Sequence, residues 1–145
     1  MAEEFAGRGL VDTSVVIELE FVVPEQLPTQ IAIAAVTLAE LAAGPHTTSD
    51  PAERARRQER LQRAEATFQA IPFDAEAARA YGHVYAHVAS SGRKPRGKRA
   101  LDLLIAATAL AADLPLHTRN PSDFDGLGAL LDVITVTAAR PGRRS

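Results

Sequence analysis

Residues 103–112 contain a single polar side chain, Thr108, and this stretch most constrains what the chain can fold into. An α-helix here would be apolar on every face, so it must be buried on all sides. Asp102 stands immediately before it. Because unpaired N–H groups and the helix dipole favour an acid at a helix N-terminus, Asp102 is expected to open this helix, either as a plain cap or as part of a site.

Polar and acidic side chains follow the apolar stretch. Asp113-Leu114-Pro115 would end the helix, and the apolar step at Leu116 indicates a short strand. The polar residues after this strand are Thr118, Asn120, Asp123 and Asp125. Asn120 and Pro121 favour a helical turn, which would place Asp123 at the strand edge and Asp125 about 200° around from it. The sequence therefore selects Asp123 over Asp125 as a site residue.

Residues 9–11 form another apolar step, and Asp12, Thr13 and Ser14 follow it directly. This pattern is typical of a buried strand whose carboxyl end turns straight into a helix. Thr13 or Ser14 would cap that helix. The alternative is that Asp12 is itself the cap.

Residues 31–36 form a second apolar run of strand length, and a helix is expected over 37–43. Glu40 lies three residues after Thr37, which is the spacing of a capping box. Glu40 therefore either bonds back to the Thr37 N–H or faces a site at the end of the strand.

Two amphipathic helices are expected between these segments. The first is strongly charged, runs from Pro51 to about Ala70, and carries Leu61 and Phe68 on one face. The second follows Asp74 as its cap. Its predicted buried stripe comprises Ala78, Tyr81, Val84, Tyr85 and Val88. His83 and His87 share a face of this helix, but no HExxH pattern surrounds them, and exposed helix histidines are far commoner than metal ligands.

Strands that alternate with helices predict an α/β fold with a parallel sheet covered on both sides. A length of 145 residues suits one domain, residues 1–145, with 1–8 and 140–145 flexible. The chain has no cysteine, which excludes disulfides, zinc–thiolate sites and thiol nucleophiles. With no long apolar run and no apolar segment near Met1, the chain is expected to be cytosolic.

The four acids Asp12, Glu40, Asp102 and Asp123 each follow or adjoin a strand end or a buried helix. In a parallel sheet the ligand site lies outside the carboxyl ends of the strands, so these acids are expected to meet there. Clustered carboxylates repel unless a cation neutralises them, and oxygen ligands favour magnesium or manganese. Such an ion would support phosphodiester hydrolysis. Thr13 or Ser14 would hold a metal-bound water or a phosphate, and Asn120 would orient Asp123.

Four segments of the chain resemble the PIN-domain ribonucleases, specifically the VapC-type toxins of bacterial toxin–antitoxin pairs. They are residues 10–14 (LVDTS), 37–41 (TLAEL), 102–109 (DLLIAATA) and 118–124 (TRNPSDF). The resemblance matches Asp12, Glu40, Asp102 and Asp123 to the acidic positions of the family, and Thr118 and Asn120 to its polar pair. At His117 the chain departs from the family, which has an apolar residue there, so local packing is expected to differ.

The resemblance implies a PIN fold, an endoribonuclease that depends on Mg²⁺ or Mn²⁺, a homodimer, and inhibition by a VapB-type antitoxin. Asp12 and Asp102 would bind the metal directly, and Glu40 and Asp123 through water. The basic run before the buried helix is predicted to contact RNA phosphates. Its members are Arg93, Lys94, Arg96, Lys98 and Arg99. Leu61 and Phe68 are predicted to bind a helical antitoxin segment.

Two other functions compete with the ribonuclease. Asp12 after a first strand also suits a phosphatase or a receiver domain that accepts a phosphoryl group. Such sites normally have a second acid beside the first and a lysine near the phosphate, whereas position 14 is Ser. A PIN-fold module that binds partners without catalysis is the non-enzymatic alternative, and the four intact acids count against it.

Overall fold

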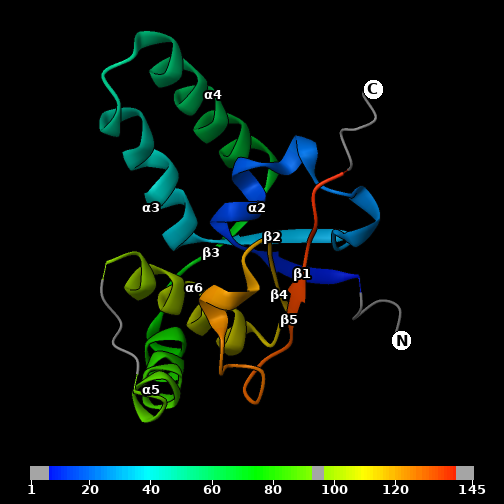
Figure 1. Cartoon of the computed structure of the whole chain (residues 1–145), viewed down its shortest axis with the longest axis vertical. Coiled ribbons are helices and arrows are strands. Elements are labelled where there is room, and N and C mark those ends of the chain that lie inside the picture. Colours follow the sequence, from blue (N-terminus) through cyan, green and yellow to red (C-terminus); the bar gives the residue numbers. More distant parts are fainter. Residues whose placement is uncertain (1–6, 93–96, 140–145) are drawn as a thin grey trace.

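The computed structural model describes residues 7–92 and 97–139, and a parallel sheet lies at its centre (Figure 1). Its strands are β1 (Arg8–Val11), β2 (Gln30–Ala34), β3 (Gln69–Ile71), β4 (Leu116–Thr118) and β5 (Val133–Thr135). They run in the order β3-β2-β1-β4-β5, and each neighbouring pair is parallel. The predicted α/β class with a parallel sheet is confirmed.

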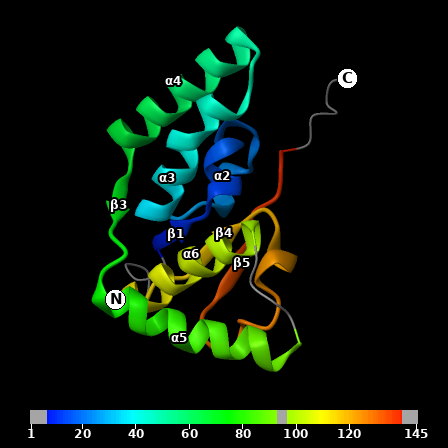
Figure 2. The ribbon, with the colours of Figure 1, turned by 90° about the vertical axis from the view of Figure 1, so that its left-hand side faces the viewer.

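Helices cover the sheet on both faces (Figure 2). They are α2 (Thr13–Ile17), α3 (Ala35–Ala43), α4 (Pro51–Thr67), α5 (Ala75–Ser90) and α6 (Lys98–Ala112). Alternate residues of a strand point to opposite faces. Leu10 of β1 accordingly belongs to the core shared with α5 and α6, and Val11 to the core shared with α2, α3 and α4.

Helix α6 is buried, as its sequence requires, but it begins earlier than predicted. Leu103, Ile105 and the alanines from 106 to 109 are fully buried. The helix starts at Lys98, after Gly97 at φ 54°, because nothing between Gly97 and Asp102 interrupts helical backbone. Asp102 is therefore not a cap but an acid in the second turn, and it is 5% exposed.

The structure also defines the starts of α2 and α3. Of the two alternatives for α2, it confirms Asp12 as the cap rather than Thr13 or Ser14, and Asp12 accepts the Val15 N–H. Helix α3 starts at Ala35 without a side-chain cap. Thr37 is thus buried inside the helix, and the capping box does not form. The cause is β2, which ends two residues before the predicted limit, so its last apolar residues begin the helix.

The remaining segments agree with the sequence in part. Asp74 caps α5 as predicted. The buried residues of α5 are Ala77, Ala80, Val84 and Val88, whereas Ala78 and Tyr85 are exposed. Strand β3 occupies a sheet edge, as expected beside Pro72. Residues 126–131 form turns instead of a short helix.

His117, the position at which the chain departs from the resembling family, packs against Gly9. A Cβ atom on Gly9 would lie 2.5 Å from His117 Cε1 and 3.1 Å from Pro28 Cβ, so only glycine fits there. The His117 ring is buried, its Nδ1 has no hydrogen-bond partner among the described residues, and burial lowers its pKa. The absence of a side chain at Gly9 provides the space that the His117 ring occupies.

Some predictions concern residues 1–6, 93–96 and 140–145, which lie outside the described part of the chain. They are the two flexible ends and the RNA contacts of Arg93, Lys94 and Arg96. Arg8, which was included in the flexible end, belongs to β1, and the neighbouring Gly7 carbonyl accepts the Gln30 N–H. No helix within residues 7–92 and 97–139 has the length and apolar character needed to cross a membrane.

Candidate active site

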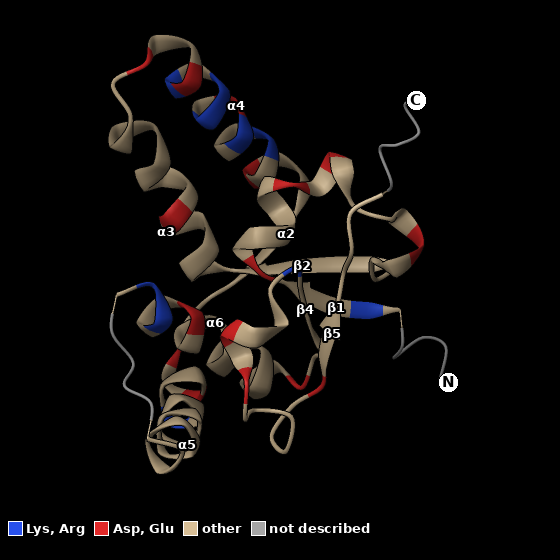
Figure 3. Cartoon of the chain, viewed as in Figure 1, with Lys and Arg blue, Asp and Glu red and all other residues tan. Residues whose placement is uncertain are grey.

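The candidate site lies where β2, β1 and β4 end, three strands that are neighbours in the sheet. Asp12 follows β1, α3 with Glu40 follows β2, and Thr118 closes β4. Figure 3 shows acidic positions on α3, on α6 and on the turn after β4, and a run of basic positions along α4. The sheet therefore brings the predicted residues to one edge.

Asp12 is a buried carboxylate, only 4% exposed. Its Oδ1 accepts the Ser14 hydroxyl at 2.6 Å and the Val15 N–H at 3.2 Å. Burial raises the pKa of Asp12, although the donors Ser14, Thr118 and Val15 and the charge of Lys98 oppose this shift. Asp12 is thus both a helix cap and a site carboxylate, so the two interpretations of its sequence position do not exclude each other.

Hydroxyl groups connect the strand ends around Asp12. Ser14 Oγ lies 3.5 Å from Thr118 Oγ1 and accepts the Arg119 N–H at 3.1 Å. Thr118 Oγ1 also accepts the Asn120 N–H at 2.9 Å. These contacts fix the end of β4 against the start of α2.

A second group of hydroxyls positions Glu40. Thr13 Oγ1 donates to Glu40 Oε1, and Thr37 Oγ1 lies 3.0 Å from Thr13 Oγ1. From its spacing to Glu40, Thr37 is predicted only as a possible helix cap. Its periodic signal was available, because Thr37 and Glu40 are three residues apart and share a helix face.

Lys98 lies among the acids rather than on an outer loop. Its ammonium Nζ is 3.0 Å from Asp102 Oδ1 and 3.9 Å from Asp123 Oδ2. Burial alone would lower the pKa of Lys98, but the hydrogen bond and charge of Asp102, with the charges of Asp123 and Glu40, raise it overall. The predicted RNA-contacting lysine is therefore the cation that holds two site carboxylates together.

Asp102 is the most perturbed carboxyl of the site. Burial, followed by the charges of Asp123 and Glu40, raises its pKa to about 6, although the hydrogen bond and charge of Lys98 act in the opposite direction. Burial disfavours the charged form of an acid, and like charges add to this effect. A further cation at this position would stabilise the ionised form.

The donors at this edge are carboxylate and hydroxyl oxygens, the type of ligand that magnesium and manganese prefer. Within residues 7–92 and 97–139 no three acidic or histidine side chains are close enough to bind a metal together. Magnesium, however, commonly takes one or two carboxylates and keeps several waters. Asp102 and Asp123 already share one cation, the Lys98 ammonium, and the residues around it supply oxygen ligands.

The other predicted site residues are placed as follows. Arg99 donates to the backbone carbonyl of Asp123 at 3.3 Å. The Asn120 carbonyl accepts the Asp123 N–H at 2.9 Å, so the Asn120 backbone holds the turn that carries this acid. Asp125 directly follows this turn, the 3₁₀ helix η4 (Pro121–Phe124), and is exposed.

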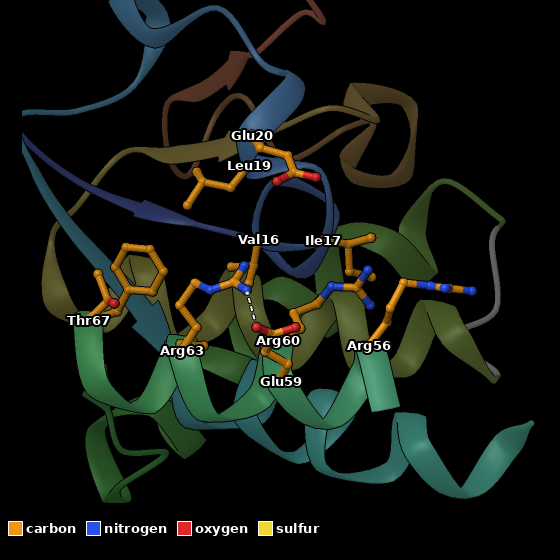
Figure 4. Close-up of a pocket in the computed structure, with 11 residues that line it drawn as sticks. Val16, Ile17, Leu19, Glu20, Arg56, Glu59, Arg60, Arg63 and Thr67 are labelled. Atoms are coloured by element: carbon orange, nitrogen blue, oxygen red, sulfur yellow. Dashed lines mark ion pairs between the residues drawn. The ribbon is translucent and has the colours of Figure 1, made fainter. Parts of the chain in front are cut away.

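A groove of about 540 Å³ lies between α4 and the segment formed by α2 and the 3₁₀ helix η1 (Leu19–Phe21) (Figure 4). Val16, Leu19, Ala64 and Phe68 contribute apolar side chains to it. Charged side chains of both signs also line the groove, namely Glu20, Arg56, Glu59, Arg60 and Arg63. Of the two predicted antitoxin contacts, Phe68 borders the groove, whereas Leu61 packs against the core around Ile33 and Leu41.

Comparisons with known proteins relate both the sequence and the structure to one group. Residues 9–129 match the family model described as PIN domain. The chain is 35% identical over 135 residues to Ribonuclease VapC5 of Mycobacterium tuberculosis, covering 90% of this chain and 96% of that protein.

Solved structures of similar fold include toxin–antitoxin complexes. A member of the VapBC family, VapBC-5 from Mycobacterium tuberculosis, is similar with a TM-score of 0.74 and 33% identity, over 89% of this chain and 98% of that chain. VapBC2 from Rickettsia felis, bound to a DNA fragment from its promoter, has a TM-score of 0.67 and 21% identity, over 88% of this chain and 98% of that chain. At this level of identity, the Rickettsia felis structure shows similarity of fold alone.

Proposed function

The chain belongs to the PIN-domain family, and we propose that it is a VapC-type toxin, an endoribonuclease that uses Mg²⁺ or Mn²⁺. One observation carries this proposal: Asp102 is buried beside the charges of Asp123 and Glu40, so that its pKa rises to about 6. A cation bound beside such a group would favour its ionised form. The similarity to a protein named as a ribonuclease supports RNA as the substrate.

Each site residue has a distinct part in the proposed reaction. Asp12 and Asp102 would hold the metal, with Glu40 and Asp123 acting on it through water. The bound ion would supply positive charge against the oxygens of the scissile phosphodiester. The Thr13 hydroxyl positions Glu40 by a hydrogen bond, and the Ser14 hydroxyl positions Asp12 in the same way. Because Lys98 pairs with Asp102 and Asp123, it would have to release them to the metal and would then be free to approach the RNA.

Total cellular RNA incubated with the purified chain tests the proposed activity. Specific cleavage is expected with Mg²⁺ or Mn²⁺ and none with EDTA, and sequencing of the new ends would identify the target. Full cleavage in EDTA would contradict the metal mechanism. Formation of an acyl phosphate on Asp12, without RNA cleavage, would instead support the phosphoryl-acceptor function.

We further propose that the groove between α2 and α4 binds a helical segment of a VapB-type antitoxin, within a complex built on a toxin homodimer. The groove combines apolar side chains with charges of both signs, which suits an amphipathic helix. The similar solved structures are described as VapBC complexes, which supports a partner of this type.

Replacing Phe68 with Asp is expected to weaken antitoxin binding by about tenfold or more, because a buried charge would replace an apolar anchor. Binding can be measured by calorimetry with a purified VapB-type antitoxin. Gln62→Asp, an equally acidic change at an exposed position of the same helix, serves as the control. If both variants bind as the wild type does and remain folded, the groove is not the docking surface.

A further inference from the structure

Helix α4 carries a row of arginines, visible as the basic run in Figure 3. Most of them have partners within the fold. Arg54 donates to the carbonyls of Pro45 and Thr48. Arg56 and Arg57 pair with Glu53, and Arg63 pairs with Glu59. Each of these four guanidinium groups therefore has a hydrogen-bond or ion-pair partner within the fold.

Arg60 is the exception on this helix. Within the described part of the chain its guanidinium has neither an ion pair nor a hydrogen bond, although the residue is half-buried. It borders the groove shown in Figure 4 and also a second cavity of about 320 Å³. An unpaired, partly buried guanidinium has five N–H donors available for an anion.

The second cavity joins Arg60 to the acids of the active site. Thr13 and Glu40 form its wall on the side of the site, and Arg57 and Glu53 form part of the other side. Glu53 is already paired with Arg57, and Glu40 already accepts from Thr13. Among the charged groups that line the cavity, Arg60 is therefore the one whose side chain has no partner within the described residues.

We propose that Arg60 binds a backbone phosphate of the RNA next to the one that is cleaved. This inference rests on the proposed ribonuclease function and adds a substrate-positioning residue to it. An RNA strand whose scissile phosphate lies at the acids must continue into an adjacent space, and the cavity of Arg60 is such a space. The planar guanidinium fork matches two phosphate oxygens, which a lysine cannot do.

An acidic protein segment is the other anion that Arg60 could bind. The cavity favours the nucleic acid, because Thr13 and Glu40 in its wall are the same residues that position the catalytic edge. An RNA strand that reaches from Arg60 to this edge would present one phosphate to the guanidinium and the next phosphate to the proposed metal site.

RNA binding by Arg60→Gln tests the proposal. Anisotropy of a labelled single-stranded RNA of mixed sequence, measured in EDTA to prevent cleavage, is expected to show about tenfold weaker binding, as for the loss of a charged hydrogen bond. The salt slope should decrease by about 0.7. Arg60→Lys should restore the slope but not the full affinity. Arg79→Gln, at an exposed position of α5 on the other face of the sheet, should bind as the wild type does.

The outcomes separate this inference from the function on which it rests. A wild type that cleaves RNA, with an Arg60→Gln variant that binds RNA equally well, would overturn the phosphate contact and leave the ribonuclease intact. If Arg79→Gln weakens RNA binding as much as Arg60→Gln does, the loss reflects the net charge of the protein and not a specific contact. That result would also overturn the proposal. If Arg60→Gln instead loses only binding to poly-L-glutamate, the site belongs to an acidic protein segment. A wild type that cleaves no RNA would refute the proposed function itself.

Discussion

Asp102→Asn is expected to abolish RNA cleavage and, at the same time, to make the metal-free protein more stable above pH 6. An amide binds a divalent cation poorly, so cleavage should decrease by at least about 100-fold, the upper end of the loss caused by removing an outer partner of a metal ligand. The stabilisation follows from the burial of this carboxyl, which is only 5% exposed.

The direction of the stability change follows from proton linkage. The pKa of Asp102 is about 6 in the folded chain, against 3.8 for an ordinary aspartate. The folded state therefore holds the proton more tightly, and wild-type stability decreases as pH rises from 3.8 through 6. The loss amounts to something on the order of 3 kcal/mol. The asparagine side chain stays neutral, so the variant avoids this loss of stability. Lys98, whose side chain is already 64% exposed, would then be solvated by water in place of its bond to Asp102.

Urea unfolding in EDTA at pH 7.5 and pH 5 measures this effect. The variant should be more stable than the wild type at the higher pH, and the difference should fall to roughly half at the lower one, because pH 5 lies between the folded and unfolded pKa values of Asp102. Asp113→Asn is a matched control at the other end of α6, where the backbone is left-handed (φ 59°) and asparagine is well tolerated. An Asp102→Asn variant that cleaves RNA normally would exclude Asp102 from the metal site.

The second large effect is expected at Asp123, not at Asp125. Asp123 Oδ2 lies 3.9 Å from the Lys98 ammonium, which also contacts Asp102, so this carboxylate shares the cation of the site. Its turn is fixed by the bond from its N–H to the Asn120 carbonyl and by the contact of Arg99 with its own carbonyl. Asp125 follows the turn with non-helical backbone (φ −57°, ψ 137°) and is exposed.

We therefore expect Asp123→Asn to slow cleavage by about tenfold or more at saturating metal, as for an outer partner of a metal site. Asp125→Asn should stay within a few-fold of the wild type. Initial rates on one RNA substrate, compared at equal metal concentration, provide the measurement. The opposite ranking would show that the turn after β4 presents the other acid to the site.

The fold could be predicted from the sequence because its strongest patterns are unambiguous. Only full burial suits the apolar run after Asp102, and strands that alternate with helices leave a parallel sheet as the simplest arrangement. Helix starts were less well predicted. Lys98 to Leu101 carry no stop signal, so α6 extends four residues before Asp102, and the acid expected at the cap is an interior residue.

Contacts between distant segments could not be predicted from local patterns. The reach of Lys98 to Asp123 depends on the packing of α6 beside the turn after β4, and the Thr13–Thr37 contact depends on how α2 meets α3. The need for glycine at position 9 also depends on a distant residue, because His117 of the neighbouring strand β4 occupies the space that a Cβ atom would take. Side-chain type therefore identified candidate site residues, but the contacts between them depend on tertiary packing, which local patterns do not predict.

Titration of the metal-free chain with Mn²⁺, followed by calorimetry, tests the central claim most directly, since it detects the ion without relying on RNA. The wild type should bind Mn²⁺, and Asp12→Asn and Asp102→Asn should lose most of that binding while Asp113→Asn keeps it. Lowering the pH below 6 should weaken wild-type binding, because Asp102 must lose its proton first. Wild-type affinity in both site variants would contradict the account.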